Sequence, residues 1–237
     1  MKRILPSILA VVVVVGLAIF LFGSSAESPA TDSTQNDSAT TTRGTQLDPE
    51  VPSGEYDVSQ FGSRIGWTAR KSLVAGYEDE GFIPVDSGMI TVSEDDQLTA
   101  NVVFDVASIE AGSVSNENAD PGRLTKHLRS DDFLAVEKYG TSTLTVTDTE
   151  PIASTTKEID YRVTADLTLK GTTKTITFPA EIGMDEETLE VLANVTIDRT
   201  RWGIRYGSDS FFDNLGDNVI DDTVDISVYL LAEPTNS

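Results

Sequence analysis

The chain has 237 residues, of which 39% are hydrophobic, and a formal net charge of −22 at pH 7. That is enough apolar material for one substantial domain with its own core. A surface this acidic repels nucleic-acid phosphates and anionic lipid headgroups, which excludes nucleic-acid binding and adhesion to a membrane through a basic patch. Because the chain has no cysteine, it has neither disulfides nor a lipid-attached cysteine, so an exported domain must be stable through its core alone.

The first 23 residues have the pattern of an export signal. Lys2 and Arg3 are followed by an uncharged stretch with a dense apolar block at 8–22. Two interpretations stand. Residues 4–22 just reach the roughly 20 apolar residues that a membrane-anchoring helix needs, and the small residues at 23–26 would suit cleavage of a signal peptide. We favour the anchor, with everything after Gly23 facing the periplasm or the exterior; cleavage would instead release the protein into the periplasm or the medium.

Residues 24–54 are dominated by Ser, Thr, Asp, Gln and Asn, with three prolines and almost no large apolar side chain. Such a segment cannot bury a core and is expected to be a flexible, disordered linker. The folded domain is therefore predicted at 55–237.

From Tyr56 onward, apolar and polar residues alternate in one segment after another, as in the run Ile159, Tyr161, Val163, Ala165. A period of two indicates strands with one buried face. Glycines and acidic turns separate these segments at hairpin distances. Strands are predicted near 56–72, 80–92, 97–110, 139–149, 158–170, 173–184, 188–200 and 218–232, with one short helix near 121–129.

Long antiparallel strands with one apolar face can hide that face by closing into a barrel, which also removes exposed sheet edges. The expected fold is therefore all-β: a single antiparallel closed β-barrel of about eight strands, with one short helix. A barrel of this size is either filled by its own side chains or holds one small ligand. The alternating pattern alone leaves both outcomes open.

Three segments carry a more specific signal: LTKHLRSDDFLAVEKY at 124–139, ADLTLKGTTKTITFPA at 165–180 and IDRTRWGI at 197–204. In order, spacing and most letters they resemble the YceI-like family. The resemblance implies an exported, lipocalin-like barrel that holds a polyisoprenoid or an isoprenoid quinone, for carriage, storage or stress protection. The alternative is a barrel with a filled core that acts through its surface, without bound lipid. The sequence also allows a homodimer.

Inward-facing positions of the predicted strands, and aromatic residues of the two irregular segments that border the barrel in the family, are the candidate ligand-binding residues. Trp67 has two equal interpretations, lipid contact and a core side chain that plugs the barrel. Lys71 is expected to extend into solvent rather than to meet a lipid headgroup. The candidate set is Ile65, Trp67, Phe82, Phe104, Phe133, Val163, Leu167, Phe178, Val195, Trp202 and Val228.

The chain departs from the family at one position. Many members have a His-x-Gly after the first strand and a further glycine seven residues on. Here Gly81 and Gly88 keep that spacing, but Asp79 stands where the histidine would be. Any headgroup or ion contact made by that histidine is therefore in doubt.

No catalytic set is expected. His127 is the single histidine, and no nucleophile or carboxylate pair accompanies it at a recognisable spacing, so a packing role is preferred. Asp198 and Arg199 are expected to form a structural network. One histidine and no cysteine rule out the usual zinc sites, and no calcium-loop spacing occurs. We expect a binding protein with no enzyme activity, metal or cofactor, whose partners are an isoprenoid-type lipid and, through an uncleaved N-terminal helix, a membrane.

Overall fold

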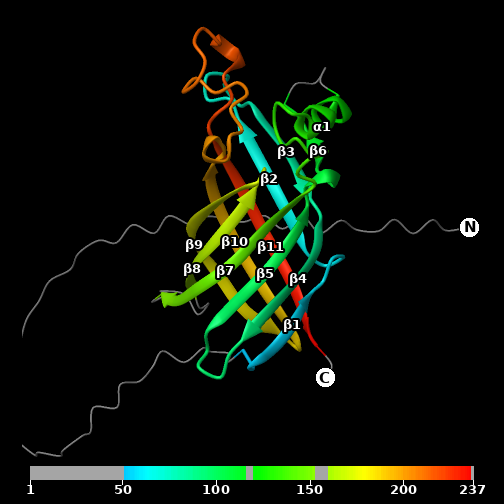
Figure 1. Ribbon diagram of the computed structural model, residues 1–237, viewed down its shortest axis with the longest axis vertical. Coiled ribbons are helices and arrows are strands. Elements are labelled where there is room, and N and C mark those ends of the chain that lie inside the picture. Colours follow the sequence, from blue (N-terminus) through cyan, green and yellow to red (C-terminus); the bar gives the residue numbers. More distant parts are fainter. Residues whose placement is uncertain (1–50, 116–119, 153–159, 236–237) are drawn as a thin grey trace, which may run out of the picture. The chain divides into compact units, whose positions relative to one another are not determined.

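The computed structural model describes residues 51–115, 120–152 and 160–235. Within them one antiparallel sheet closes on itself, because β1 pairs with β4 on one side and with β11 on the other (Figure 1). The strands are β1 (Gly54–Val58), β2 (Arg64–Arg70), β3 (Glu78–Ile83), β4 (Val85–Val92), β5 (Leu98–Asp105), β6 (Glu110–Ser113), β7 (Thr141–Ile152), β8 (Asp160–Leu169), β9 (Thr172–Asp185), β10 (Thr188–Asp198) and β11 (Thr223–Pro234).

Three pairs of these elements each act as one long, interrupted strand: β1 with β2, β3 with β4, and β5 with β6. The halves of a pair share neighbours. For example, β1 pairs with β4 and β2 pairs with β3, the two halves of the next strand, and β1 and β2 each pair with β11. Counted this way the described residues form a closed, eight-stranded meander, which confirms the predicted all-β barrel.

The interruptions have local causes. Pro84 separates β3 from β4, where its missing N–H ends the ladder. Between β5 and β6 a short 3₁₀ helix, η1 (Val106–Ser108), starts where the Asp105 carboxylate accepts a hydrogen bond from the Ser108 N–H at 3.2 Å. Between β1 and β2 the chain turns, with the Ser63 N–H donating to the Ser59 carbonyl at 3.1 Å. Each break interrupts a strand but leaves the order of the strands in the sheet continuous.

The predicted helix is α1 (Pro121–Arg129). The Asp120 carboxylate caps it by accepting from the Gly122 N–H at 3.0 Å, Pro121 occupies the first turn, and basic residues lie in the last turn. These are the signals that start and stabilise a short helix. The helix lies at the upper end of the barrel in Figure 1, and its Leu124 and Leu128 side chains pack against a buried apolar cluster.

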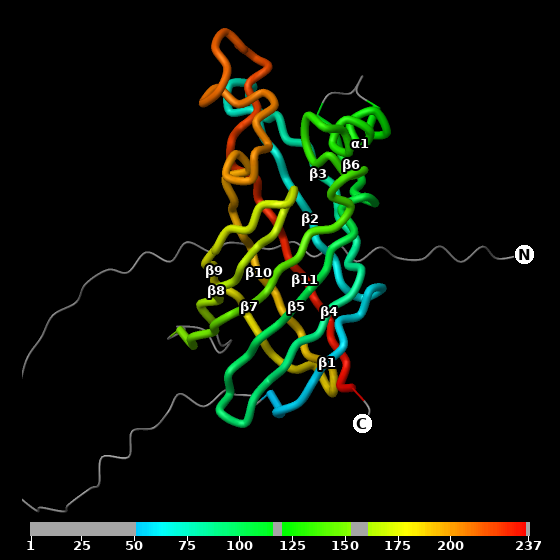
Figure 2. The backbone as a smooth tube through the Cα atoms, in the orientation of Figure 1, coloured from blue at the N-terminus to red at the C-terminus, as the bar shows by residue number. Residues whose placement is uncertain are grey.

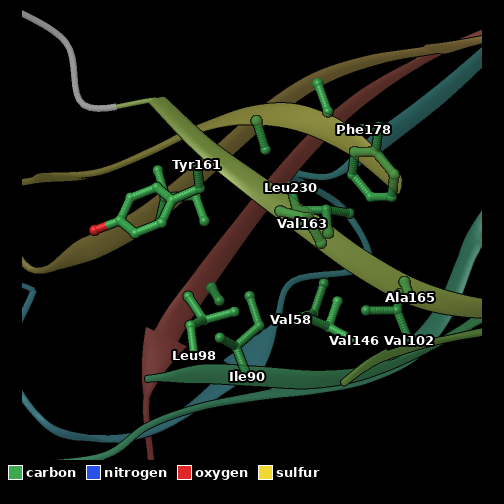
Figure 3. Close-up of a cluster of buried hydrophobic side chains, with 14 of the residues drawn as sticks. Val58, Ile90, Leu98, Val102, Val146, Tyr161, Val163, Ala165, Phe178 and Leu230 are labelled. Atoms are coloured by element: carbon green, nitrogen blue, oxygen red, sulfur yellow. The ribbon is translucent and has the colours of Figure 1, made fainter. Parts of the chain in front are cut away.

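Buried apolar side chains form two clusters. The larger one lies inside the barrel, where Val163, Phe178 and Leu230 of different strands point toward one another (Figure 3). The smaller one consists of Trp67, Val106, Ile109, Phe133, Leu134 and Ile204. We call this second cluster the upper plug, because it brings α1 and the adjoining loops onto β2 at one end of the barrel.

The wall is incompletely paired between β9 and β10. Their pairing runs from the hairpin at Asp185 and Thr188 only as far as Ala180 and Ala193. Beyond it, residues 172–179 and 194–198 have no register pair with each other, and the two strands can be followed in Figure 2. A second 3₁₀ helix, η2 (Arg199–Trp202), follows β10, and the Trp202 side chain is buried in the barrel cluster with its indole N–H donating to the Leu167 carbonyl at 3.1 Å.

The N-terminal anchor or signal at 1–23 and almost all of the 24–54 linker lie outside the described residues. Of the linker's last residues, Val51 is buried in the barrel cluster and the Pro52 carbonyl accepts from the Tyr56 hydroxyl at 2.7 Å. The folded unit thus includes residues placed in the linker by composition. In the described part of the chain, no helix combines the length and apolar character that crossing a membrane requires.

Candidate functional site

The barrel encloses a cavity of about 140 Å³. Its walls are apolar except for Ser142, whose hydroxyl donates to the Thr168 carbonyl at 2.7 Å and is thereby satisfied. Side chains from β2 to β5 and β7 to β11 contribute to the lining. A cavity with such walls is expected to exclude water and to accept hydrocarbon.

Seven of the eleven candidate residues line this cavity. They come from six strands, and their inward orientation follows from the alternation that predicted them. They are Ile65, Phe104, Val163, Leu167, Phe178, Val195 and Val228.

The other four lie elsewhere. Trp67 and Phe133 belong to the upper plug, which is the second of the two interpretations given for Trp67. Trp202 is buried in the barrel cluster but does not line the cavity. Phe82 is 46% exposed on the outer face, because its neighbour Ile83 takes the inward position opposite Ile65.

Sequence reasoning missed further lining residues, including Ile176, Val191 and Ile226 on the same strands and Leu144 on β7. Their signal was present, since each occupies an inward position of the same alternation. On β10 the lining extends from Val191 to Ile197, which at about 3.3 Å per residue corresponds to about 20 Å. The cavity is therefore narrow for its length, a shape that suits an extended chain better than a bulky ring.

A separate hollow of about 280 Å³ lies beside the upper plug. Trp67, Tyr77, His127, Phe133 and Tyr206 are among the side chains that line it. The His127 ring meets Phe133 and Tyr206 edge-on, with centroids 4.9 and 4.7 Å away. These contacts give the single histidine a packing role, and its Nε2 lies 3.3 Å from an Asp132 carboxylate oxygen.

Asp79, which stands in place of the histidine of the His-x-Gly pattern described above, borders this hollow. Its carboxylate accepts from the Tyr77 hydroxyl at 2.9 Å and from the Ser115 N–H at 3.0 Å. Burial, reinforced by the bond to Asp79, raises the pKa of Tyr77 to about 12. The tyrosine therefore stays protonated and keeps donating to Asp79 throughout the physiological range, so the aspartate is held by the protein itself.

The Asp-Arg pair of the 197–204 segment is structural, as expected. Arg199 is 3% exposed, and its guanidinium donates to the backbone carbonyls of Ile204, Tyr206, Ile220 and Asp221, each at 2.9 Å. Burial lowers the pKa of Arg199, while nearby carboxylates, Asp222 first, oppose that shift. Asp198 caps η2 by accepting from the Thr200 N–H at 2.9 Å. Arg199 thus fixes the loop after Trp202 to the start of β11.

Arg199→Lys is expected to lower the free energy of unfolding by about 3 kcal/mol, because a single ammonium cannot reach four carbonyls and hydrogen bonds to a charged group contribute about 1.5–3 kcal/mol each. Denaturant unfolding followed by circular dichroism measures this. Arg201→Lys is the matched control: Arg201 is exposed and makes one long bond, 3.4 Å, to the Thr175 carbonyl. Equal effects of the two substitutions would contradict the role given to Arg199.

Among residues 51–115, 120–152 and 160–235, no group of three or more His, Asp or Glu side chains is positioned to hold a metal ion. The features on which the site rests are accordingly an apolar cavity, a plug at its upper end and a wall that is unpaired between β9 and β10.

The fold and the cavity define a class: closed, antiparallel, lipocalin-like barrels that enclose a small apolar space. Within this class the chain belongs to the YceI-like family, since the model of the YceI-like domain matches residues 56–232.

Known proteins agree with this assignment. The chain is 37% identical over 84 residues to a UPF0312 protein of Ectopseudomonas mendocina (strain ymp), an alignment that spans 33% of this chain and 42% of that relative. Two solved structures share the fold. BcnA of Burkholderia cenocepacia has a TM-score of 0.56 at 19% identity, covering 73% of this chain and 98% of its own. A polyisoprenoid binding domain from Saccharophagus degradans, implicated in plant cell wall breakdown, has a TM-score of 0.54 at 18% identity, covering 76% and 98%.

Proposed function

We propose that this protein binds one isoprenoid-type lipid, with its apolar chain extended inside the barrel. The observation that carries the proposal is the cavity, whose lining contains one polar side chain, Ser142, already bonded to Thr168. Such walls offer nothing to a polar substrate, whereas each buried methylene contributes about 0.8 kcal/mol. Family membership and the likeness to a domain described as polyisoprenoid binding support the same ligand class.

The cavity volume of about 140 Å³ resembles the engineered cavities of about 150 Å³ that admit benzene. A long chain therefore requires the interior to widen when it is loaded. Flexible Leu and Ile side chains on several strands line the cavity, including Leu144, Leu167 and Ile176, and their rotation offers one route. This narrowness is also what favours the second candidate, a barrel that acts through its surface without bound lipid.

Chemical extraction separates the two candidates. Protein purified without detergent is extracted with organic solvent and analysed by mass spectrometry. A stoichiometric polyprenyl species is the expected result, and its mass identifies the lipid. Protein that is folded but free of lipid, and that takes up none from added isoprenoid, would favour the surface-acting barrel.

We further propose that the protein acts outside the cytoplasm, held by residues 1–23 or released from them. The support is the charge-free apolar block that follows Lys2 and Arg3. N-terminal sequencing of the mature protein distinguishes the two forms, because cleavage would produce a chain that starts near Glu27.

A further inference from the structure

Two loops, one between β2 and β3 and one between η2 and β11, lie at the upper end of the barrel in Figure 1. Four large apolar side chains are exposed in them. Leu73, 64% exposed, lies between β2 and β3. Tyr206, Phe211 and Phe212, at 45%, 45% and 52%, lie between η2 and β11. We call these four residues the apolar tip. Exposing such large apolar side chains to water is unfavourable, so their concentration at one end calls for a partner that covers them.

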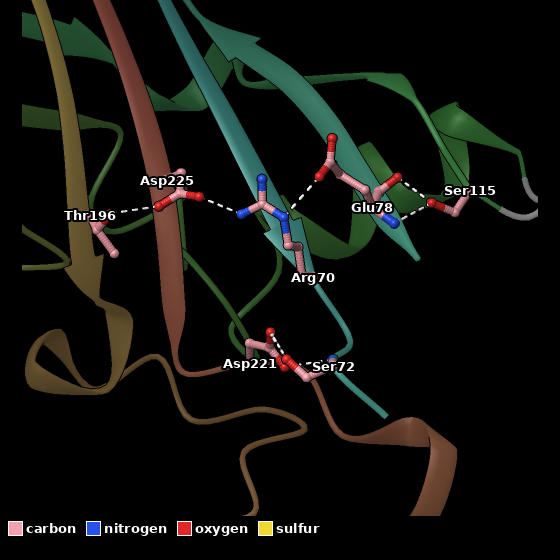
Figure 4. Close-up of polar contacts among 7 residues, drawn as sticks. All are labelled: Arg70, Ser72, Glu78, Ser115, Thr196, Asp221 and Asp225. Carbon is pink, nitrogen blue, oxygen red and sulfur yellow. Dashed lines mark hydrogen bonds and ion pairs between the residues drawn. The ribbon is translucent and has the colours of Figure 1, made fainter. Parts of the chain in front are cut away.

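The two loops are tied to each other, which makes the tip a defined surface. Asp221 accepts from the Ser72 N–H at 2.8 Å and from the Ser72 hydroxyl at 2.6 Å (Figure 4). The Asp221 N–H in turn donates to the Arg70 carbonyl at 2.9 Å. Arg70 is held by Glu78 and Asp225 (Figure 4), and Arg199 fixes the base of the longer loop. The rings are thus presented on anchored backbone.

Charges around the tip indicate what covers it. The Arg205 guanidinium lies over the Phe211 ring, 4.4 Å from its centroid. Asp209, Asp213 and Asp217 are exposed in the same loop. This excess of carboxylates repels an anionic surface, whereas a zwitterionic headgroup offers an ammonium to the carboxylates and a phosphate to Arg205. Aromatic rings are also the side chains that settle at the headgroup level of a bilayer.

We propose that the apolar tip docks on the surface of a bilayer with zwitterionic phospholipid headgroups, inserting Phe211 and Phe212 into the interface. The proposal rests on the proposed function, because a lipid that is insoluble in water has to be collected from, or delivered to, a membrane. Two half-exposed rings insert only shallowly, so the contact is weak and reversible, as lipid exchange requires.

The test places a fluorescent reporter in the tip of the full-length protein. Phe212→Trp is mixed with phosphatidylcholine vesicles that carry brominated acyl chains, and emission is compared with that of the unsubstituted protein, whose Trp67 and Trp202 are buried. The matched control is Phe61→Trp. Phe61 is 98% exposed but lies in the turn between β1 and β2, away from the tip.

Brominated lipid should quench the added emission of Phe212→Trp at least twofold and leave that of Phe61→Trp nearly unchanged. Adding phosphatidylglycerol should weaken the quenching, and salt should restore it. No quenching of Phe212→Trp, or equal quenching of both variants, overturns the proposal, and the tip would then have a different partner such as a protein.

Extraction of the same preparations separates this proposal from the proposed function. Bound isoprenoid without quenching of Phe212→Trp overturns docking alone. Quenching without bound isoprenoid overturns lipid binding while docking stands. The Phe211→Ser, Phe212→Ser double variant should keep its co-purified lipid, since neither ring lines the cavity.

Discussion

Replacing Phe178 with aspartate is expected to cost more than about 4 kcal/mol of the roughly 5–15 kcal/mol that stabilises a domain of this kind. The substitution removes a buried ring from the barrel cluster and places a carboxylate against hydrocarbon. Bound lipid should be lost together with stability. Denaturant unfolding measures the first effect, and extraction followed by mass spectrometry measures the second. The same reasoning applies to Leu167→Asp.

The neighbouring Thr177→Asp is the control, since Thr177 is exposed on the outer side of the same strand; its effect should stay within about 0.5 kcal/mol. Burial raises the pKa of the carboxyl at 178 in the folded variant above its unfolded value of about 3.9. The variant should therefore regain part of the lost stability as the pH falls through the raised pKa of the folded state toward about 3.9, and the group is neutral in both states only below that value. A penalty that does not depend on pH would contradict a charge cost at this site.

Replacing Ala193 with tryptophan is expected to abolish lipid binding while the protein stays folded. Ala193 lines the cavity, so an indole there takes the space of the ligand without adding charge. The loss of stability should remain within about 1–3 kcal/mol, the usual range for an enlarged core residue. Lipid content by mass spectrometry and thermal unfolding by circular dichroism are measured on the same preparation.

Two further substitutions, Ala165→Trp and Leu192→Trp, serve as controls that make the result specific to the cavity. Ala165 is 0% exposed in the barrel cluster but does not line the cavity, so Ala165→Trp should destabilise more than Ala193→Trp. Leu192 is 42% exposed on the outer face next to Ala193, so Leu192→Trp should keep both lipid and stability. If Ala193→Trp retains its lipid, the cavity is not the binding site. If it destabilises as much as Ala165→Trp with no lipid present in either, the interior was already full.

The barrel was predictable because its strands are half-buried. In each strand the alternation of apolar and polar residues indicates which face is buried. The eight expected strand regions contain, in whole or in large part, ten of the eleven strands observed among the described residues, and the short helix has its expected bounds; β6 lies almost wholly beyond the region predicted to end at 110. The bends were not predicted. Residues on either side of Pro84 continue the strand-like pattern, and the 3₁₀ turn after Asp105 replaces only three residues, too few to disturb a period of two.

Candidate residues lie outside the cavity lining where alternation was ambiguous or absent. Phe82 and Ile83 are adjacent and both apolar, so either could face inward, and the larger ring was the wrong guide to the cavity-lining position. Trp67 and Phe133 meet only because α1 and its following turn fold back onto β2. That contact joins residues distant in the sequence, and no local pattern encodes it. The remaining candidates face the cavity because the strand register places inward positions opposite one another, as with Val163 and Phe178.

The incomplete wall between β9 and β10 has a mechanical consequence. Moving residues 172–179 away from 194–198 interrupts no strand register pair, because the pairing ends at Ala180 and Ala193. What resists the movement is the packing of Trp202, its bond to the Leu167 carbonyl of β8 and the long bond from Arg201 to the Thr175 carbonyl of β9. Every other parting of the barrel would first have to unzip a ladder of backbone hydrogen bonds at about 1 kcal/mol each. The barrel therefore has a side that can widen while its remaining circumference stays intact, and Trp202, together with Arg201, holds that side closed.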